Sequence, residues 1–249
     1  MSDNVNQMHM DLPHDVVLLP SGGKFYKNKK KSVKVGYLTA ADENILASVG
    51  NMSGEQIINN LVRSKMYEPD LRPEDMLEGD VEAILVFLRN TSFGANYDFT
   101  LVDPETDKKF EHTISLDELD FKKNNLEPDS EGLFEITLPK SKKTVKIKFL
   151  TYGESQSISK QLESYPKGMV SPSVTLRLTK QIVEVDGTRD SNSIASFISN
   201  MPIMDSKYIN NFVRENEPRL DLTREVIAPS GKKVLTRVTF GAEFFRPFF

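Results

Sequence analysis

The stretch LPSGGKFYKNKKKSVKVGYLTAADENIL, residues 19–46, contains a Gly-Gly pair, six lysines and an alternating Val-Lys-Val run. Three structures fit these features: a phosphate-binding loop, a nucleic-acid-binding patch, or a hairpin that starts a fold. The P-loop interpretation is the weakest, because PSGGK lacks the glycine spacing and the Lys-Ser/Thr pair and leads into a strand pattern. Glycines at a tight turn supply positive φ angles. The stretch therefore predicts a hairpin followed by a helix.

The whole chain has the composition of a globular protein with a slight negative charge. It has 249 residues and a formal net charge of −4, which argues against a general nucleic-acid binder. It contains no cysteine and three histidines. The missing cysteines exclude disulfides, thiol catalysis and cysteine-ligated zinc. No arrangement of side chains indicates a catalytic, cofactor or metal site, so we predict a protein that is not an enzyme.

The sequence shows no signal for secretion or for a membrane segment. Residues 1–15 are polar and lack the cationic start and apolar stretch of a signal peptide. The longest apolar run, residues 83–88, is too short to span a bilayer. We therefore expect a cytosolic compartment.

The order of the expected elements predicts that one structural plan is used twice. The strand Val33-Lys34-Val35 aligns with Val145-Lys146-Ile147, and Tyr37-Leu38-Thr39 aligns with Phe149-Leu150-Thr151. Both halves continue with helical patterns and close with a hairpin pattern. We expect an α+β protein of two related units, each with helices packed against small antiparallel β-hairpins. A chance match of short strand-to-helix junctions is the alternative.

Polar residues before apolar runs predict where several helices begin. Thr39, with Asp42 three residues later, has the pattern of a helix start, and so has Thr151. Asp80 and Asp205 are predicted to cap the helices that follow them. The pattern of residues 173–185 also favours a helix.

The chain divides into four expected segments according to composition. Residues 122–131 and their neighbours are rich in charge, Asn, Pro and Gly, as linkers and loops are. The expected segments are a flexible N-terminal arm (1–18), a first α+β unit (19–121), a linker or loop (122–131) and a second α+β unit with an aromatic C-terminal tail (132–249).

Two groups of residues are candidates for partner binding. The lysine cluster within residues 24–34 fits a docking surface for an acidic partner, and a solvated loop is the alternative. The last six residues contain four phenylalanines and an arginine, which pack either on the chain itself or on another subunit. The candidates are Lys24, Lys27, Lys29, Lys30, Lys31, Lys34, Phe244, Phe245, Arg246, Phe248 and Phe249.

Several longer motifs occur in a fixed order along the chain. LPSGGKFY, VKVGYLTAADENIL, LVRSKM, MLEGDVEAILVFLRNTSFGANY and ISLDELDF follow one another over residues 19–121, and the chain closes with FGAEFFRPFF. This series resembles the T-even-type bacteriophage baseplate hub and hub-assembly protein family.

The resemblance implies a non-enzymatic phage tail protein that works through protein–protein contacts. It would be a structural hub subunit of the virion baseplate or a hub assembly factor, in an oligomer or hetero-complex with other baseplate or hub proteins, assembled in the host cytoplasm. A transient chaperone of the tape-measure protein is the alternative. A nucleic-acid- or phosphate-binding module that uses the Lys24–Lys34 loop is the remaining hypothesis.

The resemblance also bears on the two closing hairpins. Relatives carry Cys-x-x-Cys knuckles of zinc-ribbon type at such turns. The equivalent loops here, residues 103–109 and 228–233, have no cysteine. Zinc-ribbon-like hairpins that lack their cysteines must depend on strand pairing and packing alone.

Overall fold

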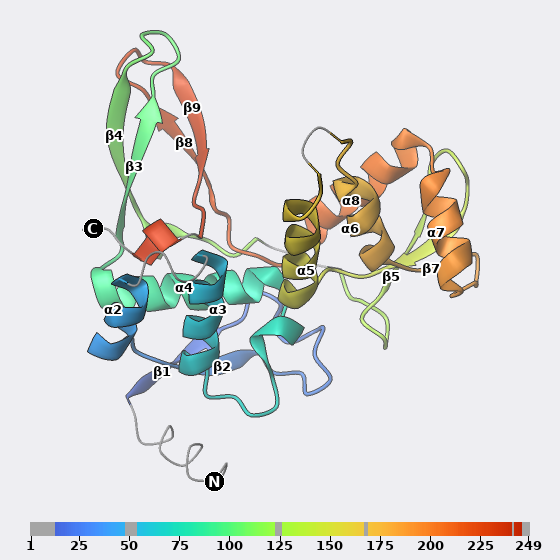
Figure 1. Ribbon diagram of the computed structural model, residues 1–249, viewed down its shortest axis with the longest axis horizontal. Helices are drawn as coiled ribbons and strands as arrows, with labels where there is room; N and C mark the ends of the chain where they lie inside the picture. The colour runs from blue at the N-terminus through green and yellow to red at the C-terminus, as the bar shows by residue number, and fades with distance from the viewer. Residues whose placement is uncertain (1–12, 48–53, 123–125, 167–168, 241, 246–249) are drawn as a thin grey trace.

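The computed structural model describes residues 13–47, 54–122, 126–166, 169–240 and 242–245. These residues form two lobes and a projecting arm (Figure 1). They contain seven α-helices and four small antiparallel sheets. The predicted α+β class, with helices packed against small antiparallel hairpins, is confirmed.

The first lobe begins with a hairpin and continues with helices. Strands β1 and β2 pair antiparallel, with Val16 opposite Lys34. Thr39 donates its backbone N–H to the Asp42 carboxylate over 2.7 Å, so the predicted helix start is confirmed. The elements are β1 (His14–Leu18), β2 (Ser32–Gly36), α2 (Ala40–Ala47), α3 (Gly54–Lys65), the 3-10 turn η1 (Pro73–Asp75) and α4 (Glu78–Phe93).

The second lobe has a similar order, with a third strand and a fourth α-helix. Thr151 accepts a hydrogen bond from the Glu154 N–H, and the Glu154 carboxylate accepts one from the Thr151 N–H, as a capping box requires. The elements are β5 (Phe134–Thr137), β6 (Thr144–Ile147), α5 (Tyr152–Glu163), α6 (Ser173–Gln181), β7 (Ile182–Val185), α7 (Ser191–Ser199) and α8 (Ile203–Asn216).

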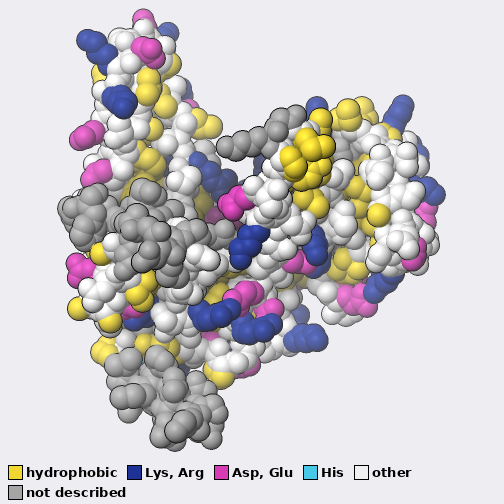
Figure 2. Space-filling view, in the orientation of Figure 1, with side chains coloured by type: hydrophobic (Ala, Val, Ile, Leu, Met, Phe, Trp, Pro, Cys, Tyr) yellow, Lys and Arg dark blue, Asp and Glu magenta, His cyan; other side chains and the backbone are white. Residues whose placement is uncertain are grey.

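The arm consists of two hairpins that come from distant parts of the sequence. In Figure 1 they stand side by side and project from the end of α4, and Figure 2 shows a wide hollow between them and the second lobe. Their elements are β3 (Asn96–Val102), β4 (Lys109–Ser115), the 3-10 turn η2 (Leu116–Glu118), β8 (Thr223–Ile227), β9 (Lys233–Arg237) and the 3-10 turn η3 (Ala242–Phe245).

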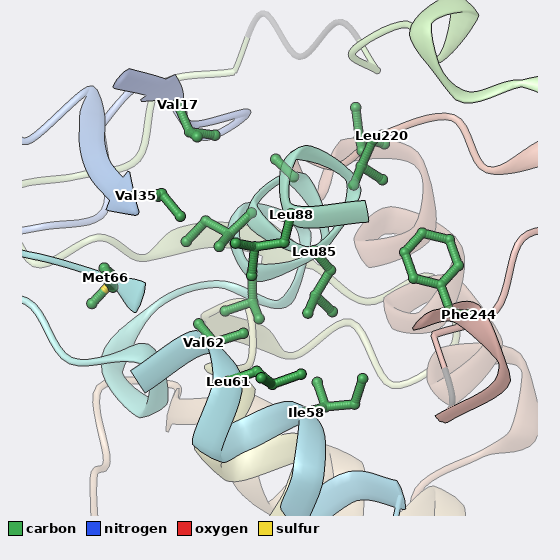
Figure 3. Close-up of a cluster of buried hydrophobic side chains, with 14 of the residues drawn as sticks. Val17, Val35, Ile58, Leu61, Val62, Met66, Leu85, Leu88, Leu220 and Phe244 are labelled. Carbon is green, nitrogen blue, oxygen red and sulfur yellow. The ribbon is translucent and has the colours of Figure 1, made fainter. Parts of the chain in front are cut away.

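Each lobe has its own cluster of buried apolar side chains. The first cluster joins β1, β2, α3 and α4, and Figure 3 shows Val17, Val35, Leu61 and Leu88 pointing toward one another in it. The second cluster contains side chains of β5, β6, α6, α7 and α8, together with Leu77 of the first lobe. The chain then returns to the first lobe, where Leu220, Leu222, Val238, Phe244 and Phe245 complete the first cluster.

Equivalent contacts in the two lobes support the repeated plan. Val35 of β2 bridges Met66, the residue that follows α3. Ile147 of β6, which the sequence aligns with Val35, pairs with Ile182, the residue that follows α6. In both lobes the residues that follow a helix pair with the second strand of the hairpin, on the side that the first strand leaves free.

Four expectations need correction. Residues 182–185 form a strand instead of extending a helix, because they pair with β6. Residues 14–18 of the expected flexible arm form β1. Asp80 and Asp205 are not helix caps: the cap positions are Leu77 and Pro202, and each aspartate lies inside the first turn. Residues 1–12 of the expected arm lie outside the described residues, and how the chain divides into units stays a prediction.

Candidate functional site

Three hairpin turns in the molecule share a proline and are each bound by a buried aspartate. The turns contain Pro20, Pro139 and Pro229, which follow β1, β5 and β8. In each turn the residue before the proline donates its N–H to a lysine carbonyl at the far end of the turn: Leu19 to Lys31, Leu138 to Lys143 and Ala228 to Lys232, over 2.8–2.9 Å. The side chains of Asp80, Asp205 and Asp103 each accept one or two further N–H groups of these turns.

Asp80 lies near the N-terminus of helix α4 and binds the proline turn that follows β1. Its Oδ1 accepts the Ser21 N–H over 2.8 Å, and its Oδ2 accepts the Tyr26 hydroxyl. That hydroxyl in turn accepts the N–H of Leu77 over 3.0 Å. Burial raises the pKa of Asp80, and the bonds from Ser21 and Tyr26 offset only part of this effect. Burial, together with the Asp80 charge, also raises the pKa of Tyr26.

Asp205 lies near the N-terminus of helix α8 and binds the proline turn that follows β5. Its two oxygens accept the N–H groups of Lys140 and Ser141 over 2.7 and 2.9 Å. Burial alone would raise the pKa of Asp205, but these bonds, with a smaller contribution from Lys142, lower it. Asp80 and Asp205 thus hold equivalent positions, but the pKa of Asp80 is raised and that of Asp205 is lowered.

Asp103 binds the third turn across the tips of the arm. Its carboxylate accepts the Ser230 N–H over 3.0 Å and the Ser230 hydroxyl over 2.7 Å. It also accepts the N–H groups of Glu105 and Thr106 in its own turn. Burial opposes ionisation, but these hydrogen bonds lower the pKa of Asp103 to about 2. The charged carboxylate therefore joins the two hairpins of the arm.

The lysine cluster lies on the loop that Asp80 holds. Lys30 pairs with Glu68 and, over 3.5 Å, with Asp70; the hydrogen bond to Glu68 raises the pKa of Lys30. Lys24 pairs with Glu127. In Figure 2 basic and acidic side chains lie next to one another on the lower part of the molecule, where Figure 1 places this loop. Two of the six candidate lysines thus form ion pairs within the chain.

The other candidate lysines point into solvent. Lys27, Lys29, Lys31 and Lys34 are exposed. The Lys29 backbone is left-handed, with φ of 50°, and its ammonium donates to the Lys24 carbonyl over 3.1 Å. Within the described residues, this gives a loop of fixed shape with three exposed cations, and a fourth, Lys34, on the strand that follows it.

The aromatic C-terminus divides into a buried part and a part that is not described. Phe244 and Phe245 are 1% and 0% exposed and pack in the first cluster. The Phe244 ring lies 5.3 Å from Tyr97 and 4.9 Å from Phe240. Of the two alternatives, packing on the chain itself or on another subunit, these two residues follow the first. Arg246, Phe248 and Phe249 lie outside the described residues.

A charged cluster at the joint between the lobes had no signal in the sequence. Arg219 lies 2.8 Å from Glu82 of α4, 3.5 Å from Glu217 and 3.9 Å from Glu78. Burial raises the pKa of Glu82, and it raises that of Glu217 to about 7; Arg219 opposes both effects. Glu82 and Arg219 are 137 residues apart, so no local pattern could indicate their contact.

A groove of about 500 Å³ runs between α3 and α5 and has a polar lining. Glu74 pairs with Arg63 within the first lobe, and Asn59 of α3 accepts a hydrogen bond from Gln156 of α5. The Gln156–Asn59 bond therefore links the two lobes across the groove. In the part of the chain that the structure describes, no three His, Asp or Glu side chains form a metal site, and no helix is long and apolar enough to cross a membrane.

Comparison with known families gives one match that spans most of the chain. The family described as T4 bacteriophage base plate protein matches residues 14–246. The match covers both lobes, the arm and the basic loop. No curated protein and no solved structure matches the chain.

Proposed function

This chain belongs to the T4 bacteriophage base plate protein family, and we propose that it is a non-enzymatic component of the baseplate hub. In this role it is either a structural hub subunit or a hub assembly factor. It acts through contacts with other baseplate proteins, and its incorporation takes place in the host cytoplasm.

The observation that carries this proposal is the anchored basic loop. Lys27, Lys29 and Lys31 are exposed on a loop whose turn is bound by Asp80, and Lys34 is exposed on the strand β2 that follows it. A loop that already has its bound shape loses less conformational entropy on association than a free loop. Exposed cations also accelerate encounters with acidic surfaces. The loop therefore suits contact with an acidic protein surface.

A charge reversal tests this role. We expect that changing all four exposed lysines to Glu lowers recovery of the chain with other baseplate proteins from infected cells at least tenfold. The matched control changes Lys108, Lys109, Lys232 and Lys233 at the tip of the arm, with the same change in net charge, and should keep recovery near wild type. Equal recovery of the two variants would contradict the role of the loop.

The alternative is a transient chaperone of the tape-measure protein, and the same loop would suit its client. Mass spectrometry of purified virions separates the two roles, because a structural subunit remains in the virion and a transient chaperone does not. Salt-sensitive binding of the purified chain to DNA would instead support the nucleic-acid hypothesis.

A further inference from the structure

The outer edges of β1 and β5 are equivalent positions in the two lobes. Each strand is at the edge of its sheet: among the described residues, β1 pairs only with β2, and β5 pairs only with β6. Each leads directly into its proline turn, through Leu19 and Leu138. The two edges can therefore be compared residue by residue.

The hydrogen bonds of the turns fix which backbone groups face outward. Leu19 donates to the Lys31 carbonyl, so residues 19 and 31 form a hydrogen-bonded pair of the antiparallel ladder. Hydrogen-bonded and non-hydrogen-bonded pairs alternate along an antiparallel ladder. Val16 and Leu18 therefore belong to non-hydrogen-bonded pairs, and their N–H and C=O groups point away from β2. Lys34, the β2 partner of Val16, likewise directs its backbone groups away from β1: its carbonyl accepts the Tyr67 N–H and its N–H donates to the Glu68 carboxylate, both over 2.9 Å.

The second lobe gives the same geometry with different side chains. Leu138 donates to the Lys143 carbonyl. By the same alternation, Glu135 and Thr137 direct their backbone groups outward from β5. Both side chains are exposed and polar. A charged residue on an exposed edge opposes pairing with another strand, so this edge is protected.

The first lobe has apolar residues at these positions. Val16 is 60% exposed and Leu18 is 62% exposed, although Val17 between them is buried in the first cluster. No described strand pairs with this edge. It offers backbone hydrogen-bonding groups and an apolar strip together, as a site for strand addition does.

The charges next to β1 indicate what kind of strand fits. Lys34 stands opposite Val16 on the exposed face, and Lys31 lies just beyond Leu18. Pairing with β1 of a second copy would place two sets of exposed lysines in one four-stranded sheet, each one strand behind the seam, and would add their like charges. A strand with carboxylates would instead be attracted.

We propose that β1 receives an extended segment of another baseplate protein, which adds to the sheet as a third strand. The segment carries apolar side chains against Val16 and Leu18 and acidic side chains near Lys31 and Lys34. This inference rests on the proposed function, because it names the contact by which the chain joins its assembly.

Single cysteines test the geometry, since the chain has none of its own. The variants Val16→Cys and Leu18→Cys are introduced in the phage, and baseplate assemblies from infected cells are treated with a short thiol- and light-reactive crosslinker. We expect both positions to crosslink to one segment of one other baseplate protein, at residues two apart, because strand neighbours on one face have a period of two. Glu135→Cys and Thr137→Cys are the matched controls and should not give this pattern.

Other crosslinks would overturn the inference. Crosslinks from positions 16 and 18 to residues 1–12 of the same chain, to a second copy, to scattered residues, or to nothing at all would each contradict an added partner strand. Absence of the chain from every assembly would instead contradict the proposed function itself. The two failures are therefore distinguishable.

A second variant tests the same edge without a crosslinker. Val16→Glu with Leu18→Thr reproduces the edge of β5, and both positions are exposed. Its recovery in assemblies should fall at least tenfold while its melting temperature stays at the wild-type value. Wild-type recovery would overturn the proposal; a lowered melting temperature would leave the crosslinks to decide.

Discussion

Asp80 and Asp205 occupy the third position of α4 and of α8, and each binds the backbone of the proline turn of its own lobe, Asp80 by one N–H group and Asp205 by two. Asp80 lies deep between the turn and Tyr26, and burial raises its pKa. Asp205 accepts two backbone N–H groups, which lower its pKa in spite of its burial. The repeated plan therefore fixes where the carboxylate lies, and the surroundings decide whether its charge is favourable.

The residue before each aspartate shows a second difference. Gly79 packs against Pro218 and Arg219 at the joint between the lobes, whereas its counterpart Met204 is 60% exposed. The first lobe thus uses the start of its helix to receive the returning chain. The second lobe leaves the same position in solvent.

The largest expected effect comes from exchanging these two residues. Gly79→Met should lower the free energy of unfolding by about 3 kcal/mol or more, because any Cβ at this position would collide with the Pro218 carbonyl. The control Met204→Gly should cost about 1 kcal/mol, the usual cost of glycine in a helix. Urea unfolding measures both, and equal values would show that the two helix starts are packed alike.

Removing the two aspartates should give the next largest effect. Asp80→Ala leaves the buried Ser21 N–H and Tyr26 hydroxyl without their acceptor and should cost about 3 kcal/mol. Asp205→Ala should cost about 1–2 kcal/mol, because its turn lies nearer to solvent. Thermal unfolding of the two variants at neutral pH would contradict this ranking if Asp205→Ala were the less stable.

A third comparison concerns the helix C-termini. Gly94 caps α4, whereas the buried Glu217 caps α8, where a negative charge opposes the helix dipole. Because its pKa rises from 4.5 to about 7 on folding, the folded state holds this proton more tightly than the unfolded state. Wild-type stability should therefore fall as the pH rises from 4.5 to 7 and then level off.

Glu217→Gln tests this pH dependence. The variant should lack the fall and be more stable than wild type at pH 8 by about 1 kcal/mol, since the lost pairing with Arg219 offsets part of the gain. Unfolding curves between pH 5 and 8 provide the measurement. A parallel fall in both proteins would assign the pH dependence to another group.

The smallest effect is expected at the tip of the arm. The pKa of Asp103 is lowered to about 2, so its contribution is present above the ordinary value of 3.8 and is lost as the pH falls through about 2. Asp103→Asn should speed hydrogen exchange of the Ser230 amide about tenfold and leave the melting temperature nearly unchanged. Ser230→Ala keeps the N–H bond and should have a smaller effect; equally fast exchange in wild type and Asp103→Asn would contradict the link.

The sequence predicts the local elements well where local chemistry decides them. The alternation of Val33-Lys34-Val35 and the capping box at Thr151 both correspond to observed elements. Asp80 and Asp205 look like helix caps, but turns 59 and 65 residues away recruit their carboxylates. The strand Ile182–Val185 follows a helical pattern, and its pairing with β6 overrides that local preference.

The candidate site could be predicted only in part for the same reason. The lysine loop is visible as a run of like residues, whereas the apolar edge of β1 appears only when its register is known. The cluster around Arg219 needs contacts across both lobes. Tertiary pairing therefore supplied what composition and spacing could not.

The return of the chain to the first lobe has a consequence for folding during synthesis. The buried residues of the second cluster extend no further than Ile209, whereas the first cluster needs Leu220 through Phe245. A ribosome releases the second cluster's residues while the first still lacks part of its core. The lobe that is made first is thus completed last, because its core closes only after residues 220–245 have been translated.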